Sequence, residues 1–286
     1  MKKKFNWYNL AFLSPGFIIF TIFLIIPLLL SFYYSFTNWN GLSANVKFTG
    51  LTNFRFLLKE PMFLDSLRIT LVITALTTLL LNAVGIVCAA VLNQEGSFYK
   101  TGRTLIFIPA ILSPVVASFI WAYMTQTNGG IINTLLGAVN IAPVDFYRSA
   151  DSMVRMVSGV ISWAALGFYT TIYIANLKSI PGEIYEAADI DGAGRLRQFF
   201  SLTIPMLRPA IIINTITALI WGLKQFDFVR VMVPGHIQTV TIYAIERAFE
   251  YNMFGYSSAV VIVLLLLTLF VSLIQMTIMN RKEIDY

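Results

Sequence analysis

The residues whose types and spacing suit polar chemistry are concentrated in one segment, from Pro181 to Pro205. Only 12% of the chain is charged, yet this segment carries four carboxylates and two guanidinium groups. They belong to Glu183, Glu186, Asp189, Asp191, Arg195 and Arg197. Apolar stretches of membrane-spanning length flank the segment on both sides. The charged side chains are therefore grouped as on a docking surface for another protein.

The pattern within this segment predicts a helix, a sharp turn and a second helix. Pro181 suits a first helical turn, where its missing N–H costs little, and the carboxylates that follow favour the positive end of the helix dipole. Gly192 and Gly194 allow the chain to turn. Residues 195–202 restart a helix, which we expect Pro205 to end. A simple connecting loop requires none of this order, so the pattern favours a docking surface.

The composition excludes most catalytic chemistries. Among 286 residues, Cys88 is the only cysteine and His236 the only histidine, which excludes intrachain disulfides, cysteine-based zinc sites and most hydrolytic centres. We therefore expect no enzyme activity. The hydrophobic fraction of 57% and the mean hydropathy of +0.75 are far above those of a soluble domain. The net charge of +6 is explained by basic flanks of membrane helices rather than by nucleic-acid binding.

The apolar stretches predict six transmembrane helices, since about 20 apolar residues span a hydrocarbon core. The expected spans lie near 11–35, 67–92, 104–126, 154–178, 207–229 and 257–280, with a loop at 179–206. Lys2 to Lys4 before an apolar run also fit a signal peptide, but the run is too long and lacks a cleavage site, so we expect a retained helix. The fold class is thus an all-α polytopic membrane protein, with one domain over 1–286.

Basic residues close to helix ends favour a cytoplasmic location for both termini and for the polar segment. The fifth span is unusual because its apolar run between Arg208 and Lys224 is short. Either this helix is short, or it continues past Lys224, in which case Lys224 and Asp227 lie within the depth of the bilayer, share a helix face and can pair. Lys224 either extends to the interface or faces a water-filled cavity. Asn82 and Ser113 are expected to form hydrogen bonds between helices.

The polar segment resembles the E-A-A-x3-G-x9-[IL]-x-[IL]-P loop of permease subunits in binding-protein-dependent ABC importers. The matching residues are Glu186, Ala187, Ala188, Gly192, Leu202, Ile204 and Pro205. Further matches resemble the carbohydrate-uptake branch, which contains the maltose and glycerol-3-phosphate permeases. They follow in order along nearly the whole chain, at 48–54, 103–109, 113–116, 121, 130–136, 226–227 and 255–259. Residues 233–239 depart from that branch's T-G-G-G-P-x-x-x-T pattern.

The resemblance implies a type I ABC importer permease in the bacterial cytoplasmic (inner) membrane. An extracytoplasmic solute-binding protein would deliver a sugar, an oligosaccharide or a related polyol. Two ATPase subunits, which bind ATP and Mg²⁺, would dock on the 181–205 loop, and a second homologous permease, usually a different chain, would complete the pathway. This chain itself would hold no cofactor and bind no nucleic acid.

The resemblance also assigns roles to two groups of residues. Coupling to the ATPase falls to Glu186, Ala187, Ala188, Asp191, Gly192 and Pro205. Candidate substrate contacts fall to Phe168, Tyr169, Trp221, Gly222, Lys224 and Gln225. Two other classes of protein are alternatives. A secondary transporter requires coupling carboxylates inside its spans, and a membrane-embedded enzyme requires a nucleophile motif; neither class explains the ordered matches.

Overall fold

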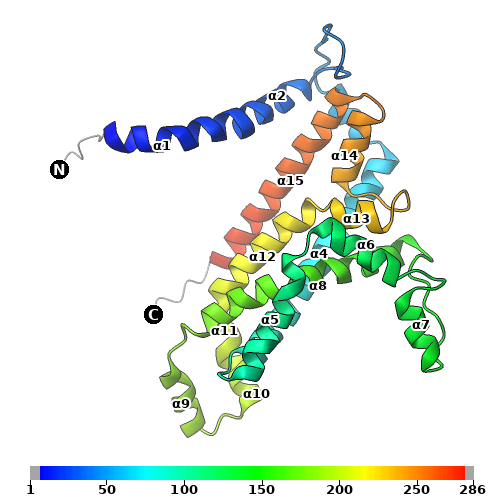
Figure 1. The fold of residues 1–286 in the computed structure, drawn as a ribbon. Coiled ribbons are helices and arrows are strands. Elements are labelled where there is room, and N and C mark those ends of the chain that lie inside the picture. The colour runs from blue at the N-terminus through cyan, green and yellow to red at the C-terminus, as the bar shows by residue number, and fades with distance from the viewer. Residues whose placement is uncertain (1–6, 281–286) are drawn as a thin grey trace. The chain divides into compact units, whose positions relative to one another are not determined.

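The structure is a computed structural model that describes the backbone of residues 7–280, and this range is built from helices (Figure 1). Within it, the only β pairing is an isolated bridge between Thr37 and Phe48. The elements are α1 (Trp7–Phe20), the π-helix η1 (Thr21–Ile25), α2 (Ile26–Tyr34), α3 (Thr52–Leu57), α4 (Pro61–Leu92), α5 (Ser97–Ile111), α6 (Pro114–Met124), α7 (Ile131–Ala138), α8 (Ala150–Leu177), α9 (Gly182–Ile190), α10 (Arg195–Gln198), the π-helix η2 (Phe199–Thr203), α11 (Ile204–Met206), α12 (Arg208–Leu223), α13 (Asp227–Met232), α14 (Val240–Phe249) and α15 (Phe254–Asn280). The all-α fold class is confirmed.

The described chain divides into two compact units. The first unit contains the residues up to Leu64 together with Tyr243–Leu266, and the second contains Asp65–Ile242 and the residues from Leu267 onward. Helices α4, α14 and α15 pass from one unit into the other, and each unit is described below by itself. The expectation of a single domain stays a prediction.

Four helices of the described range are long and apolar enough to cross a membrane. They are Phe12–Tyr34, Pro61–Leu92, Ala150–Leu177 and Phe254–Thr277. Two further candidates are pairs of helices bent at a break, and the count reaches the predicted six only if each pair forms one span. The predicted third span is thus interrupted, the predicted fifth span follows a bend at its start, and the two breaks have different causes.

The predicted third span, 104–126, is divided into α5 and α6, whose axes differ by 99°. Pro114 is the first residue of α6, and the preceding Ser113 has extended geometry with ψ of 134°. A residue before proline avoids the helical region because the proline ring collides with it, so the helix stops there. Ser113 is exposed at this break, and its side chain forms no hydrogen bond among the described residues, contrary to its predicted interhelical role.

The helix leading to the predicted fifth span, 207–229, does not end at Pro205. Pro205 lies inside α11, and the chain bends by 65° at Leu207, directly before α12 begins at Arg208. The preceding η2 explains this, because its wider turn lets the Ile204 N–H bond to the carbonyl of Phe199, five residues back. A π turn relieves the contact between a proline ring and the preceding carbonyls. The span then stops at Leu223, short of the predicted residue 229.

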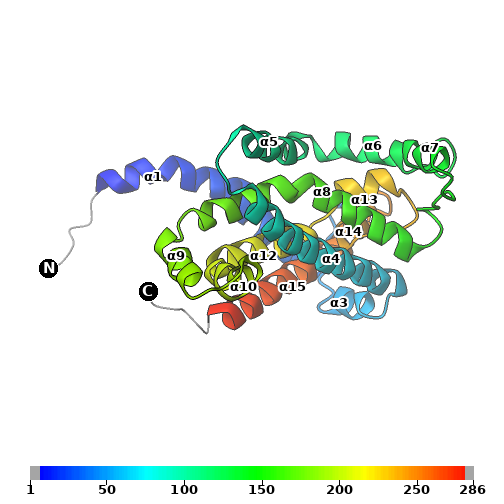
Figure 2. The same cartoon turned by 90° about the horizontal axis from the view of Figure 1, so that it is seen from below.

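Helix α8 is the central element of the second unit and lies between α5 and α12, both of which pack against it (Figure 2). Its buried face, which includes Val157 and Ile161, packs with α13 residues such as Val229 in one apolar core. The crossing with α5 is close at Gly167, where a β carbon would collide with the carbonyl oxygen of Ile106. The absence of a side chain at Gly167 thus sets the distance between α5 and α8.

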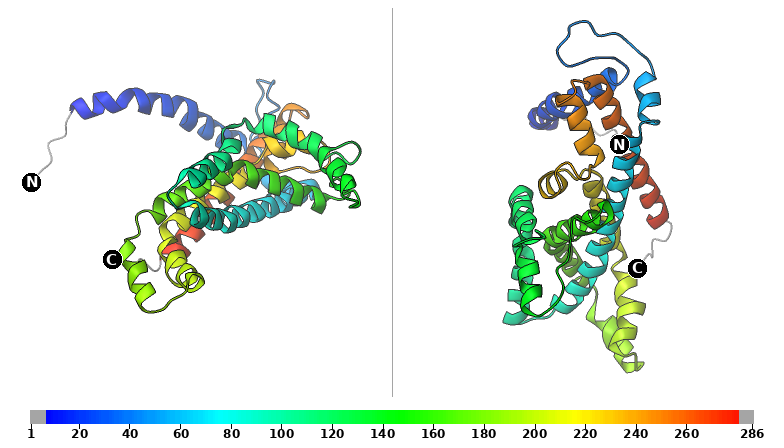
Figure 3. Two further views of the ribbon diagram at one scale, coloured as in Figure 1. Left: turned by 60° about the horizontal axis from the view of Figure 1, so that its bottom comes forward. Right: turned by 90° about the vertical axis from the view of Figure 1, so that its right-hand side faces the viewer.

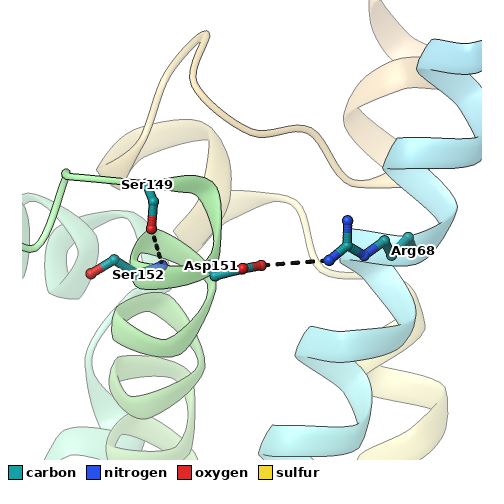
Figure 4. A network of polar contacts seen from close by, with 4 residues as sticks. All are labelled: Arg68, Ser149, Asp151 and Ser152. Atoms are coloured by element: carbon teal, nitrogen blue, oxygen red, sulfur yellow. Dashed lines mark hydrogen bonds and ion pairs between the residues drawn. The ribbon is translucent and has the colours of Figure 1, made fainter.

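The segment from α9 to α11 forms a hairpin at one end of the second unit, drawn in yellow-green in Figure 3. At the opposite end of α8, Ser149 caps the helix by accepting a hydrogen bond from the Ser152 N–H at 3.2 Å. Asp151 lies 3.7 Å from the Arg68 guanidinium of α4 (Figure 4). Both partners of this ion pair are largely exposed, so it contributes at most about 1 kcal/mol.

In the first unit, α14 packs on the start of α15 through polar aromatic groups. The hydroxyl oxygens of Tyr243 and Tyr256 are 2.9 Å apart. The Arg247 guanidinium lies 4.8 Å from the ring centres of both Tyr243 and Tyr251. Among residues 12–34 of α1, η1 and α2, most of the apolar side chains are exposed within this unit, which is expected of a helix that faces lipid or another subunit.

Candidate functional site

The turn of the hairpin is closed by a Schellman cap at the end of α9. The Ala193 N–H donates to the Ala188 carbonyl at 2.9 Å, and the Gly192 N–H donates to that of Asp189 at 3.0 Å. Such a cap requires a left-handed residue, and Gly192 provides it with a φ of +73°. The predicted glycine turn is confirmed.

Side chains hold the two limbs of the hairpin together. The Gln198 amide of α10 donates to the Asp189 carboxylate at 2.6 Å and to the Ala193 carbonyl at 2.8 Å. Nearer the membrane spans, the hydroxyl oxygens of Tyr185 on α9 and Thr203 on η2 are 3.1 Å apart. Because both the turn and the base are tied, the hairpin is formed without a partner protein.

The residues predicted to couple this chain to an ATPase lie on this hairpin but not in one group. Glu186, Ala187, Asp191 and Gly192 are exposed on α9 and its turn, and the neighbouring Ala188 is half-buried. Pro205 is on the second limb, in α11. Among the side chains described, residues 12–277, no ion pair involves Glu186, so its carboxylate is available to another protein.

A cavity of about 290 Å³ opens in the second unit beside the break between α5 and α6. Three of the predicted substrate residues line it: Phe168 and Tyr169 of α8, and Trp221 of α12. The Phe168 side chain is 48% exposed, whereas Tyr169 is buried at 2%. An aromatic wall with few polar groups is typical of a small-molecule site, and the faces of aromatic rings stack on sugars.

The other three predicted substrate residues lie outside the cavity lining. A β carbon at Gly222 would lie 3.0 Å from the Cα of Thr74, so this glycine permits a close crossing of α12 and α4. Gln225 is 4% exposed, and its amide lies 3.5 Å from the Trp221 carbonyl. Lys224 is exposed at the end of α12.

The predicted pairing of Lys224 with Asp227 is wrong for the described structure. The helix ends before Lys224, and Asp227 begins α13, so the two residues do not share a helical face. Most residues of the cavity wall were not predicted from the sequence. These lining residues are Phe107, Pro109, Ala110, Leu112, Pro114, Ala164, Ala165, Thr217 and Phe228. The two prolines inside one apolar run were the available signal, because they mark a break that opens space beside a helix.

These features define a class of protein: a helical membrane protein with broken spans, an aromatic cavity and an exposed polar hairpin. Within the described residues, no group of histidine, cysteine or acidic side chains is arranged to hold a metal ion. The chain belongs to the family described as the binding-protein-dependent transport system inner membrane component, which matches residues 81–283.

Curated relatives are similar along most of their length. The diacetylchitobiose uptake system permease protein NgcF of Streptomyces coelicolor is 34% identical over 91% of this chain and 78% of the relative. The multiple sugar-binding transport system permease protein MsmF of Streptococcus mutans is 29% identical over 99% and 98%. In a crystal structure, a bacterial alginate ABC transporter is in complex with an alginate pentasaccharide-bound periplasmic protein; one of its chains superposes with a TM-score of 0.83. That chain is 22% identical over 96% of this chain and 94% of its own length, and the likeness shows the fold alone.

The chain is therefore an integral inner-membrane permease subunit of an ABC importer that works with a binding protein. Its family transports solute rather than catalysing a reaction, and ATPase activity belongs to separate subunits of such importers.

Proposed function

We propose that this permease subunit translocates a sugar, an oligosaccharide or a related polyol delivered by an extracytoplasmic solute-binding protein. The observation that carries the proposal is the similarity, over most of the chain, to permeases named for the uptake of diacetylchitobiose and of multiple sugars. The aromatic cavity lined by Phe168, Tyr169 and Trp221 supports a sugar-like substrate. A second homologous permease subunit, a different chain, would form the other half of the pathway.

The second part of the proposal is that two ATPase subunits, which hold ATP and Mg²⁺, dock on the 181–205 hairpin. Its exposed Glu186 carboxylate and its fixed turn at Gly192 support this role. Ala187 and Ala188 present small side chains for close packing, Asp191 adds a second charge, and Pro205 lies near the end of the second limb, which leads back to the spans. The hairpin and both termini would then be cytoplasmic.

Docking through Glu186 predicts that Glu186→Gln lowers ATP-dependent uptake about ten-fold, because a charge-assisted hydrogen bond is worth about 1.5–3 kcal/mol. The measurement is uptake by proteoliposomes that contain the importer co-purified with its partners through a tag on this chain. Glu183→Gln is the matched control, since Glu183 is exposed on the same helix. Equal uptake by the two variants, at equal recovery of the ATPase subunits, contradicts the assignment.

For the substrate contacts, we propose that Phe168 and Tyr169 stack on the sugar while Trp221 closes the cavity. Gly222 and Gln225 would support this wall from behind, through the close contact with Thr74 and the burial of the amide. Lys224 would contact the substrate after the substrate has left the cavity. Its single charge favours a sugar that bears an acidic group only if it contacts the substrate directly.

Phe168→Ala is expected to lower uptake about five-fold, because an aromatic stacking contact contributes about 1 kcal/mol. The assay offers diacetylchitobiose, arabinotriose, maltotriose and an alginate trisaccharide to the same proteoliposomes. ATP hydrolysis is expected to stay at the wild-type rate. Phe119→Ala, which removes an exposed phenylalanine of α6 outside the cavity lining, is the control. If ATP hydrolysis falls together with uptake, Phe168 is not a substrate contact.

A further inference from the structure

A second cavity, about 670 Å³ in volume, lies where the hairpin joins the ends of the spans. Its walls come from the last turn of α4, the turn into α5, the end of α8 and both limbs of the hairpin. The lining residues are Ala90, Val91, Asn93, Gln94, Tyr99, Leu177, Tyr185, Arg195, Gln198, Phe199 and Thr203. All of them belong to the second unit, and none is among the residues proposed to couple the ATPase or to contact substrate.

The cavity lies at the level where two spans end. Ala90 and Val91 are in the last turn of α4, and Leu177 is the last residue of α8. Just beyond them, the Lys178 ammonium lies 3.7 Å from the Glu95 carboxylate, so the two helix ends are close together. The 28 residues of α8 extend about 42 Å, which matches a bilayer with its headgroup regions, about 40–45 Å. The cavity is therefore at the depth of lipid headgroups.

The polar part of the lining offers hydrogen-bond donors and a positive charge. Among the described lining residues, Arg195 is the only charged one, and no carboxylate lines the cavity. The Arg195 guanidinium, the Tyr99 hydroxyl and the Gln94 amide form no ion pair or hydrogen bond with other described side chains or with the described backbone. Donors and a cation without a carboxylate are complementary to an anion that has several acceptor oxygens, such as a phosphate ester.

The walls of this cavity are held in place from both sides. Asn82 Oδ1 of α4 accepts hydrogen bonds from the Tyr173 hydroxyl of α8, at 2.5 Å, and from the Thr215 hydroxyl of α12, at 3.3 Å. The predicted interhelical role of Asn82 is confirmed. On the hairpin side, the hydroxyl oxygens of Tyr185 and Thr203 are 3.1 Å apart, and both residues line the cavity. The cavity is thus formed before a ligand binds.

An apolar stripe on α4 leads into the cavity. Val84, Val87 and Val91 follow one another at helical spacing, so they lie on one face of the helix. Their side chains are 40%, 54% and 55% exposed, and Val91 lines the cavity. A soluble phosphate ester has no use for such a stripe, whereas an acyl chain buries it. The ligand that fits both parts has a phosphate at one end and a hydrocarbon chain at the other.

We propose that this cavity binds an anionic phospholipid. The Arg195 guanidinium pairs with the lipid phosphate, and the Tyr99 hydroxyl and the Gln94 amide donate to its other oxygens. One acyl chain follows the valine stripe of α4. Because Arg195 is on the hairpin while Tyr99 and Gln94 are not, the bound lipid bridges the hairpin and the spans. An effect of the lipid on transport rests on the proposed function of the hairpin, but binding does not.

The binding test uses the importer purified in detergent through a tag on this chain, with its partner subunits present. Short-chain phosphatidylglycerol is titrated, and its binding is followed by native mass spectrometry. Arg195→Gln is expected to weaken binding about ten-fold and Tyr99→Phe about three-fold, because each removes donors to the phosphate. Arg197→Gln is the matched control and should bind like the wild type, since Arg197 is exposed on the same helix but does not line the cavity.

Two further ligands identify the source of the phosphate. Short-chain phosphatidylcholine is zwitterionic and glycerol 1-phosphate has no acyl chain, so each should bind about ten-fold more weakly than phosphatidylglycerol. Equal binding of glycerol 1-phosphate would indicate a site for a soluble phosphate ester. Equal binding of phosphatidylglycerol by Arg195→Gln and the wild type would place the lipid elsewhere. Loss of the ATPase subunits from Arg195→Gln would assign the cavity to the docked ATPase. Each of these three results overturns the proposal.

The effect on transport is measured separately, in proteoliposomes of phosphatidylcholine with and without phosphatidylglycerol. Phosphatidylglycerol is expected to raise the rate of ATP hydrolysis by the wild type and by Arg197→Gln, but not by Arg195→Gln. Binding that depends on Arg195 without any response of ATP hydrolysis supports the lipid site and contradicts coupling through the hairpin. A response of ATP hydrolysis that is equal in Arg195→Gln and the wild type contradicts the lipid site.

Discussion

Gly192→Pro is expected to reduce ATP-dependent uptake to background while the chain still inserts into the membrane. Proline holds φ near about −65°, which the observed φ of +73° excludes. The substitution also removes the N–H that donates to the Asp189 carbonyl. The Schellman cap is lost, and the two limbs of the hairpin no longer meet a docked ATPase in fixed positions. The measurement is uptake together with ATP hydrolysis in reconstituted importer.

Gly194 provides the control for this prediction. It lies two residues further along the same turn, has ordinary backbone geometry with φ of −63°, and has open space where a β carbon would stand. Gly194→Ala should therefore transport like the wild type, whereas Gly192→Ala should show a partial loss because of its left-handed backbone. Normal transport by Gly192→Pro, with a normal content of ATPase subunits, would show that the turn does not matter for coupling.

Gly167→Val is expected to have the second large effect, on stability as well as transport. A β carbon at this position would meet the main chain of α5 at Ile106 and Phe107, and the main chain cannot turn aside as a flexible side chain does. Overpacking of this kind costs about 1–3 kcal/mol, and a drop in Tm of about 5 °C or more is expected for a chain of this size. Transport should fall too, because Phe107 and Phe168 line the same cavity.

The control for Gly167 is on the same helix. A β carbon at Gly159 of α8 would have no neighbour within 4 Å, so Gly159→Val changes the residue type without forcing a contact. Both variants are compared by thermal unfolding of the purified importer in detergent. Equal Tm values for the two would mean that α5 does not depend on a close approach at Gly167.

The hairpin was predictable from sequence because its signals are local. These signals act over a few residues: a proline at the start of the helix, carboxylates in its first turns and a glycine after its last turn. The structure contains the predicted helix as α9 and the left-handed turn at Gly192. The bends at Ser113 and Leu207 were not predicted, since length and hydropathy measure only how apolar a run is. The direction of each bend depends on proline geometry and on the helices packed against it.

In the candidate substrate site, too, some features could be predicted from the local sequence and others depend on packing between helices. Phe168, Tyr169 and Trp221 were selected by type and position, and the structure brings all three to one cavity. Gly222 and Gln225 were selected by the same reasoning, yet neither lines the cavity. Gly222 faces α4 at Thr74, and Gln225 lies beyond the end of α12 at Leu223. Which side of a helix meets a cavity depends on contacts between distant parts of the chain, and no local pattern specifies it.

The two π-helices have a consequence for the direction in which side chains point. Each ends two residues before a proline, at Pro27 for η1 and at Pro205 for η2, and in each the next N–H bonds to a carbonyl five residues back. Since one residue advances an α-helix by about 100° around its axis, one additional residue in a turn rotates everything beyond it by that angle. Residues spaced by three or four positions therefore lie on the same helix face when both are on one side of a π turn. The same spacing does not place two residues on one face when the π turn lies between them. Beyond Pro27 and Pro205, the direction in which side chains point around the helix axis differs from the direction expected of one regular α-helix.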